Sequence, residues 1–247
     1  MKARNASVAV IGAGDFIGTA IAKRFAREGY LVVVGRRTAA KLERLKDAIE
    51  SEGGRCLAHA LDARKEEDVA EFLKAADSAA PLEVCVINPG ANVSFPILET
   101  TERVFRKVWE MACCGGFLAG REAARLMIPR GRGTILFTGA TASVRGGVGY
   151  AAFASAKFGL RALAQSMARE LGPKNIHVAH LVIDAGVDTE FVRDRIRSRG
   201  GEAAVENLAE DQLMNPDSIA NAYWFLHTQT RDGWTFELDI RPFMEKW

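Results

Sequence analysis

The chain has 247 residues, of which 48% are hydrophobic, and its 33 basic and 31 acidic side chains leave a net charge of +2. This length and composition suit one large α/β domain with a full core. The charges form no basic stripe, which argues against a nucleic-acid binder, and no apolar run approaches the length of a membrane span. The N-terminus carries no signal peptide pattern, so we expect a cytoplasmic protein.

The four cysteines show no spacing typical of a redox or metal site. Cys56 and Cys85 fall in or beside apolar segments, and Cys113 and Cys114 form a pair in a helical region. No spacing of His, Cys, Asp or Glu suggests a metal ion. We therefore expect buried, reduced thiols and no metal.

Apolar segments typical of strands alternate with segments of helical periodicity along the chain. The expected strands are residues 7–11, 31–34, 56–61, 84–88, 134–138, 176–183 and 235–240. The expected helices are residues 17–25, 41–51, 66–76, 101–128 in one or two pieces, a helix opening near Phe153, and 217–227. This alternation predicts one doubly wound α/β domain over residues 1–247, with a seven-stranded, mostly parallel sheet and helices on both faces. Residues 187–213 form an irregular, helix-rich insertion.

A glycine-rich turn joins the first strand to the first helix. It reads Gly12-Ala13-Gly14-Asp15-Phe16-Ile17-Gly18. Glycines allow the backbone to turn tightly and to approach a phosphate, and the helix N-terminus offers free N–H groups and a positive dipole end. Such turns also occur where nothing binds, but the place of this one in the first strand–helix unit favours a dinucleotide site.

Further motifs follow the later strands. Asp62 follows the third strand, Asn88-Pro89-Gly90 follows the fourth, and Lys157 lies on the helix after the fifth. In this order and spacing, the chain resembles the short-chain dehydrogenase/reductase family along nearly its whole length. The resemblance implies a Rossmann-type fold that binds a nicotinamide cofactor.

The same resemblance assigns cofactor contacts residue by residue. Gly12 and Gly18 match the outer glycines of the family's turn, whereas Phe16 replaces the middle one. Asp62 matches the acid that contacts the adenine, and Thr189 matches a threonine near the nicotinamide carboxamide. The implied cofactor-binding residues are Gly12, Gly14, Phe16, Ile17, Gly18, Arg36, Arg37, Asp62, Asn88, Gly90, Lys157 and Thr189.

The segment after the second strand bears on the choice of cofactor. In an NAD-binding unit, an acid at the end of this strand accepts the ribose 2′-OH. Here the sequence is Gly35-Arg36-Arg37, and two guanidinium groups suit a 2′-phosphate. Two exposed arginines could also be ordinary surface residues. We expect NADP(H) rather than NAD(H).

Most of the family's proton-transfer residues have no match in this chain. In the family, a tyrosine four residues before the lysine transfers the proton, a serine orients the substrate oxygen, and an asparagine supports a proton relay. When the sequence is aligned on Lys157, these three places hold Phe153, Ala140 and Ala112. The chain therefore resembles an atypical member that keeps the cofactor lysine and lacks the tyrosine, serine and asparagine.

Other side chains near these places could take over the missing chemistry. Tyr150, one helical turn before Phe153, is our candidate proton donor. Thr138, Thr141 and Ser143 could supply a hydroxyl, but for these three we favour a bond to their own backbone. Asp184 and Asp188 could place a carboxylate by the nicotinamide or equally serve in a cap or loop. His177 and His180 alternate along a strand and suit a structural position better than a catalytic one.

Two functions remain open at this point. The first is an oxidoreductase that transfers a hydride between NADP(H) and an unidentified carbonyl or alcohol, with a rearranged proton donor. The second is a cofactor-binding protein without catalysis, which acts as a sensor, scaffold or partner subunit. The loss of a general acid alone costs roughly 10²–10⁴-fold in rate, so turnover depends on a replacement.

The partners and the substrate pocket are less defined. The family pairs the helices that match residues 101–128 and 153–171, and both are rich in apolar residues here, so we expect a homodimer or homotetramer. Residues 187–213 should form much of the substrate pocket or its lid. The arginines Arg193, Arg195, Arg197 and Arg199 could favour an acidic substrate or form a solvated segment. Phe243 and Trp247 near the C-terminus could dock on this domain or on a neighbouring subunit.

Overall fold

The computed structural model describes residues 2–245 and contains one seven-stranded sheet. Its strands are β1 (Ser7–Ile11), β2 (Leu31–Arg36), β3 (Arg55–Ala60), β4 (Leu82–Ile87), β5 (Gly133–Thr138), β6 (Ile176–Ile183) and β7 (Glu237–Ile240). Their order is β3-β2-β1-β4-β5-β6-β7, and all six neighbouring pairs are parallel. The chain therefore leaves β1 in opposite directions for its two halves, which places a switch point between β1 and β4.

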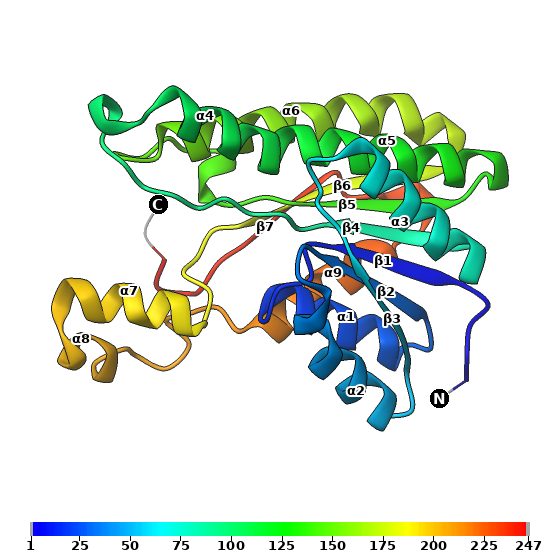
Figure 1. Ribbon diagram of the computed structural model, residues 1–247, viewed down its shortest axis with the longest axis horizontal. Coiled ribbons are helices and arrows are strands. Elements are labelled where there is room, and N and C mark those ends of the chain that lie inside the picture. The colour runs from blue at the N-terminus through cyan, green and yellow to red at the C-terminus, as the bar shows by residue number, and fades with distance from the viewer. Residues whose placement is uncertain (1, 246–247) are drawn as a thin grey trace.

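Helices cover both faces of this sheet (Figure 1). They are α1 (Ile17–Arg27), α2 (Glu43–Ser51), α3 (Glu66–Ala79), α4 (Glu102–Trp109), α5 (Gly115–Met127), α6 (Ala151–Leu171), α7 (Glu190–Gly200), α8 (Glu202–Glu206) and α9 (Pro216–His227). One core cluster joins the sheet to α1, α2 and α9, and a second joins it to α3, α5 and α6. The predicted α/β class, with a parallel sheet between two helix layers, is confirmed.

The strands are continuous apolar runs because both faces of the sheet are covered. In β1, Val8 and Val10 pack in the α1–α9 layer, whereas Ala9 and Ile11 pack in the opposite layer, and all four are fully buried. A solvent-facing sheet would need polar residues at alternate positions. Gly29 directly follows Glu28, the C-cap of helix α1, and its φ of 86° is the left-handed conformation that glycine adopts without strain.

Most element boundaries lie within two residues of the expected ones, and β1 and β6 coincide with them. The helix expected near Phe153 begins at Ala151. The long helix expected at 101–128 forms α4 and α5, joined by a π-helical turn at Glu110–Cys114. This turn admits one extra residue per turn, which shifts the faces that α4 and α5 present to α6.

The predictions for the cysteines, for membrane-spanning segments and for the C-terminal aromatic residues are compared with the structure in turn. Cys56, Cys85 and Cys113 are buried free thiols, whereas Cys114, the last residue of the π-helical turn, is only partly buried. Among residues 2–245, no helix combines the length and apolar character needed to cross a membrane. Of the two C-terminal aromatic residues, Phe243 is largely exposed and Trp247 lies outside the described residues.

The close approach at the start of α5 yields a stability prediction. Gly115 has helical dihedrals, yet a Cβ there would lie 2.8 Å from the backbone oxygen of Ala63. We expect Gly115→Ala to lower the free energy of unfolding by about 1–3 kcal/mol, although alanine favours helices, because a backbone atom cannot move aside cheaply. Gly233→Ala is the matched control, since nothing lies within 4 Å of its Cβ position, and it should change stability by less than about 0.5 kcal/mol. Equal urea midpoints for the two variants would contradict this packing argument.

Candidate functional site

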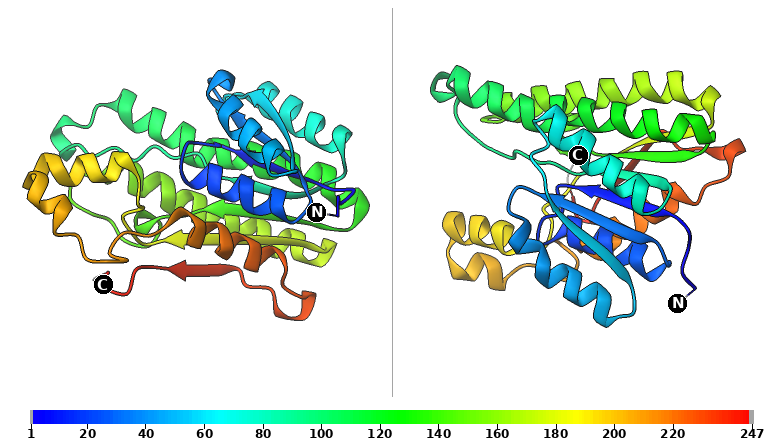
Figure 2. Two further views of the ribbon diagram at one scale, coloured as in Figure 1. Left: turned by 90° about the horizontal axis from the view of Figure 1, so that it is seen from below. Right: turned by 45° about the vertical axis from the view of Figure 1, so that its right-hand side comes forward.

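A cavity of about 760 Å³ opens at the carboxyl ends of the strands, the usual ligand-binding edge of a parallel sheet. It lies between the loops that follow β4, β5 and β6, the start of α6, and helix α7. Helices α7 and α8 stand beyond this edge of the sheet (Figures 1 and 2). Its lining brings together these predicted site residues and family positions: Ile17, Asn88, Gly90, Ala140, Tyr150, Phe153 and Lys157.

The other predicted residues lie outside the lining of this cavity. They are Gly12, Gly14, Phe16, Gly18, Arg36, Arg37, Asp62, Ala112 and Thr189. Those of the turn and the loops after β2 and β3 sit along the same edge of the sheet, where a long ligand would extend away from the cavity. Thr189 caps α7, because its Oγ1 accepts a hydrogen bond from the Val192 N–H.

The glycine-rich turn is held by backbone contacts that exclude larger residues. Gly12 has a φ of 82°, and a Cβ there would lie 2.9 Å from the Pro89 nitrogen. A Cβ on Gly18 would lie 2.6 Å from the Ala13 Cα, so the start of α1 packs directly on the turn. Gly14, in contrast, has no atom within 4 Å of its Cβ position and faces open space.

In the part of the chain that the structure describes, no side chain caps the N-terminus of α1, and the preceding Asp15 carboxylate is paired with Arg36. Phe16 occupies the N-cap position, no side chain caps the helix, and its first turn contains no acidic residue. Phe16 has a φ of −118°, so this position does not require glycine, and the side chain is 39% exposed. The turn and the open helix end together fit the diphosphate of a dinucleotide.

The two arginines after β2 differ in their partners. Arg36 forms an ion pair with Asp15 of the turn, with 2.6 Å between Nη1 and Oδ1. Arg37 is exposed and has no hydrogen-bond or ion-pair partner among residues 2–245. Gly35 cannot be replaced by an acid without rearrangement, because a Cβ there would lie 2.6 Å from Leu61 and 2.9 Å from Phe72. This end of the strand is therefore basic.

Asp62 is already bound within the chain. Its two carboxylate oxygens accept hydrogen bonds from the Arg64 guanidinium, and Oδ1 also accepts from the Arg64 N–H. These hydrogen bonds lower the pKa of Asp62 to about 2. An adenine ring that used this carboxylate would share it with Arg64.

Lys157 is the most strongly perturbed cation of the cavity. It is 3% exposed, and its Nζ donates a hydrogen bond of 2.7 Å to the backbone oxygen of Thr138. Burial lowers its pKa to about 8. Its Nζ lies 5.8 Å from the ring centroid of Phe153, so an aromatic ring without a hydroxyl stands beside the ammonium group.

The hydroxyl groups near Ala140 are engaged elsewhere. Ser143 Oγ accepts a hydrogen bond from the Ala140 N–H, so this serine bonds the backbone of its own loop, one of the two alternatives expected from the sequence. Thr138 Oγ1 lies 2.6 Å from Tyr223 Oη on α9. Thr141 donates to the buried carboxylate of Asp184, which also pairs with Arg241 at 3.2 Å. Of these, Thr138 and Thr141 line the cavity.

Tyr150 combines a hydroxyl with a cationic partner. It lies at the N-cap of α6 and lines the cavity, and its Oη accepts a hydrogen bond from the Arg195 guanidinium on α7. The same guanidinium carbon lies 5.6 Å from the centre of the Tyr150 ring. No sequence signal pairs these two residues, because they are 45 positions apart and on different elements.

The remaining candidates belong to the scaffold. His180 is fully buried, and its Nδ1 lies 3.0 Å from the Glu237 carboxylate. His177 stacks on Trp234, with the ring centroids 4.9 Å apart. Asp188 forms an ion pair with Arg193. None of these three lines the cavity, and among residues 2–245 no group of His, Cys, Asp or Glu could hold a metal ion.

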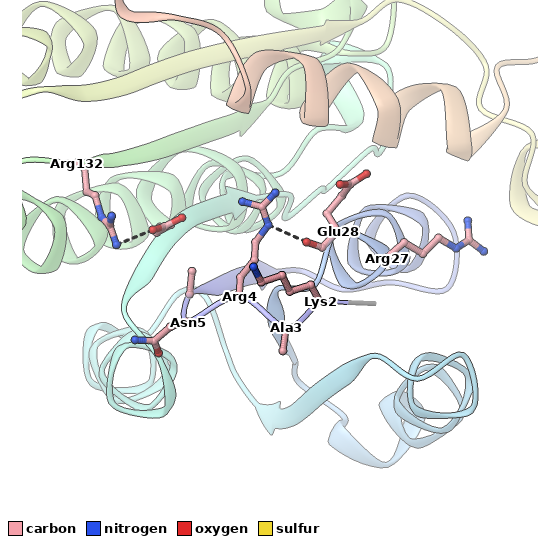
Figure 3. A pocket seen from close by; sticks show the side chains of 9 residues that line it. Lys2, Ala3, Arg4, Asn5, Arg27, Glu28 and Arg132 are labelled. Atoms are coloured by element: carbon pink, nitrogen blue, oxygen red, sulfur yellow. Dashed lines mark hydrogen bonds and ion pairs between the residues drawn. The ribbon is translucent and has the colours of Figure 1, made fainter.

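A second hollow of about 650 Å³ lies at the amino ends of the strands (Figure 3). Several of its charged groups are engaged with one another: Arg4 donates to the Glu28 carbonyl oxygen, and Arg132 pairs with Glu83 at 2.7 Å. Among the described residues of its lining there is no glycine-rich turn and no helix N-terminus. The cavity at the carboxyl ends is therefore the better candidate for a functional site.

Comparisons with known proteins agree with this geometry. The chain is 28% identical over 223 residues to the 3-oxoacyl-[acyl-carrier-protein] reductase MabA of Mycobacterium tuberculosis. The matched region covers 90% of this chain and 85% of MabA. It is 58% identical to a short-chain dehydrogenase from Rhodopseudomonas palustris of known crystal structure, with a TM-score of 0.83 over 97% of this chain and 100% of the other. The structure of an alcohol dehydrogenase from Thermococcus sibiricus, complexed with 5-hydroxy-NADP, matches at 28% identity and a TM-score of 0.82 over 98% of each chain. The profile described as short chain dehydrogenase matches residues 6–199, and the chain therefore belongs to the short-chain dehydrogenase family of oxidoreductases.

Proposed function

We propose that this protein is an NADP(H)-dependent oxidoreductase that acts on a carbonyl or alcohol substrate with Tyr150 as its proton donor. One observation carries the proposal: the Tyr150 hydroxyl and the Lys157 ammonium line a single cavity, and Arg195 donates a hydrogen bond to that hydroxyl. The family accounts for the reaction class, and these side chains account for how a proton can move without the usual tyrosine.

The cofactor fits the carboxyl edge of the sheet. The turn from Gly12 to Gly18 and the open end of α1 would bind its diphosphate, and Lys157 would hold the ribose next to the nicotinamide. Arg37, exposed and unpaired within the described residues, would bind the 2′-phosphate. The Thermococcus sibiricus relative, crystallised with 5-hydroxy-NADP, supports NADP(H) over NAD(H).

Tyr150 would supply the proton in the direction of reduction. The chemistry that NADPH would supply, when bound, is the hydride that reduces the carbonyl carbon to the alcohol. The phenol of Tyr150 gives its proton to the carbonyl oxygen and later regains one from solvent. The guanidinium of Arg195 stabilises the phenolate between these steps, because it donates a charge-assisted hydrogen bond to the phenolic oxygen.

A second function rests on a different observation. The ring of Phe153 stands beside Lys157, where the family places its phenol, and both Ala140 and Ala112 lack a polar group. A protein of this composition could bind NADP(H) and serve as a sensor, scaffold or partner subunit without turnover. Self-association through residues 101–128 and 153–171 also remains a prediction, supported by the exposed side chains of Phe105, Trp109, Phe117 and Phe158.

Replacement of the candidate proton donor separates the two functions. We expect Tyr150→Phe to lower the rate of NADPH oxidation with a panel of carbonyl compounds by roughly 10²–10⁴-fold, with NADPH affinity unchanged. Tyr30→Phe is the control, because it removes the same atom from a buried residue at the opposite end of the sheet. An unchanged rate for Tyr150→Phe would exclude this donor, and tight NADPH binding by a wild-type protein without turnover would favour the non-catalytic function.

The choice of cofactor depends on Arg37. We expect Arg37→Gln to weaken NADPH binding by about 10-fold and to leave NADH binding unchanged, because only NADPH carries the 2′-phosphate. Fluorescence titration measures both affinities. Arg44→Gln removes an equal charge from the exposed face of the next helix and should affect neither cofactor. Equal losses for NADPH and NADH would mean that Arg37 does not read the phosphate.

Burial of Lys157 predicts a pH-dependent stability. Its pKa of about 8 in the folded protein lies below the ordinary value of 10.5, so at neutral pH folding buries a charge at a cost of about 3 kcal/mol. Between pH 8 and pH 10.5 only the unfolded chain keeps this proton, and the wild-type protein should therefore become more stable as pH rises through this window. Lys157→Met should be more stable at pH 7, lack this rise, and bind NADPH weakly.

Chemical denaturation at several pH values tests this behaviour. Lys41→Met, at an exposed position, is the control and should follow the wild-type profile. A Lys157→Met variant that is less stable than wild type at pH 7 would show that the ammonium group contributes more through its bond to Thr138 than it loses on burial.

A further inference from the structure

The arginines of α7 fall into two pairs on two faces of the helix. Arg193 forms an ion pair with Asp188 at 2.6 Å, and Arg197 pairs with Asp194, Glu190 and Glu202. Carboxylates of the same segment therefore neutralise both of these arginines, as is common for a solvated face.

Arg195 and Arg199 point the other way and line the cavity. Within residues 2–245, Arg195 bonds only the neutral hydroxyl of Tyr150, with its guanidinium beside the same ring, and Arg199 has no hydrogen-bond or ion-pair partner. Carboxylates neutralise Arg193 and Arg197 on one face of α7 but not Arg195 and Arg199 on the other. The helix therefore presents uncompensated positive charge to the cavity.

A third arginine approaches from the opposite wall. Arg145, in the loop after β5, lines the same cavity and comes no closer than 4.0 Å to the Asp184 carboxylate. That carboxylate is already bound by Arg241 and Thr141, so it neutralises Arg145 only in part. Glu245 is the one acidic side chain among the described residues of the lining, against three arginines and Lys157.

The wall between these arginines is apolar. Val192 and Ile196 of α7 line the cavity in the same helical stripe as Arg195 and Arg199, and Leu213 and Phe153 face it from other elements. A ligand with an apolar body and an acidic group would match both parts of this surface.

We propose that Arg199, Arg145 and Arg195 bind an acidic group of the substrate, so that the substrate class is carbonyl compounds that carry a carboxylate. Guanidinium groups bind carboxylates through paired, charge-assisted hydrogen bonds, and this geometry does not require a buried site. This assignment rests on the proposed reductase function, because it places the acidic group near Tyr150. The phosphates of the cofactor are the other possible anion, and the test below separates the two sources.

Calorimetric titration of the protein saturated with NADP⁺ tests the assignment. The probes are phenylglyoxylate, a keto acid with an apolar phenyl ring and a carboxylate, and its methyl ester, which has the same ring and no charge. We expect the acid to bind at least about 10-fold more tightly than the ester. Arg199→Gln should lower the affinity for the acid by about 10-fold and leave that for the ester unchanged. Arg197→Gln, on the solvated face of the same helix, is the matched control and should change neither.

Three results would overturn the assignment. Equal or undetectable binding of the acid and the ester would mean that no anion site exists. If Arg199→Gln and Arg197→Gln lowered the affinity for the acid equally, the arginines would act only through the overall positive charge of the helix and not through direct contact with the carboxylate. A loss of NADPH affinity in Arg199→Gln, without a change for the acid, would assign them to the cofactor.

The proposed reductase function stands or falls on a separate readout. If the acid binds in an Arg199-dependent way but is not reduced by NADPH, the anion site stands and the reductase function is wrong for this ligand class. If the ester is reduced as well as the acid and Arg199→Gln reduces both equally, the reductase function stands and the anion site is wrong.

Discussion

The hydrogen bond from the Asn88 side chain to the Gly12 carbonyl oxygen joins the loops that follow β1 and β4. The strand order of the sheet reverses between these two strands. At 2.9 Å, it ties the end of β4 to the glycine-rich turn, and Pro89 packs so closely on Gly12 that no Cβ fits between them. The open end of α1 and the mouth of the cavity both depend on this contact. Because parallel strands bring all their carboxyl ends to one edge, the groups after β4, β5 and β6 then converge beside it.

The cavity combines a buried cation with a hydroxyl group that we propose as the proton donor. Lys157 remains buried against a backbone oxygen although desolvation lowers its pKa to about 8, a cost that a purely structural position would not require. Its neighbour Phe153 cannot transfer a proton, and the hydroxyls of Thr138, Thr141 and Ser143 are engaged with Tyr223, Asp184 and a backbone amide. Tyr150 is the hydroxyl whose partner is a cation.

Helix α7 carries both the hydrogen-bond partner of Tyr150 and part of the cavity lining. Its N-terminus is fixed by the Thr189 cap, and Val187 pairs with Met214 at the base of the insertion. The helix therefore holds Arg195 on Tyr150 while the apolar side chains of Val192 and Ile196 face the same cavity. A ligand in the cavity would therefore meet the same helix that positions the proposed proton donor.

The sequence by itself determined the order of strands and helices and the parallel sheet. Apolar runs such as β1 can occur only where both faces of a sheet are covered, and this requirement is local enough to read from the pattern. It also predicted the glycine-rich turn after the first strand and the position of Lys157 on the helix after the fifth strand, and in a parallel sheet the ends of those strands share one edge. The sequence did not predict the π-helical turn at Glu110–Cys114, because the helical periodicity of apolar residues continues through a single wide turn.

Only the tertiary structure decided which side chains meet. Residues 45 positions apart, Tyr150 and Arg195, come together because the insertion after β6 folds back over the start of α6. The four alternating arginines look alike in the sequence, yet helical geometry turns Arg193 and Arg197 toward carboxylates and Arg195 and Arg199 toward the cavity. Charge compensation is a property of three-dimensional neighbours, and for this reason the spacing of the residues alone could not reveal it.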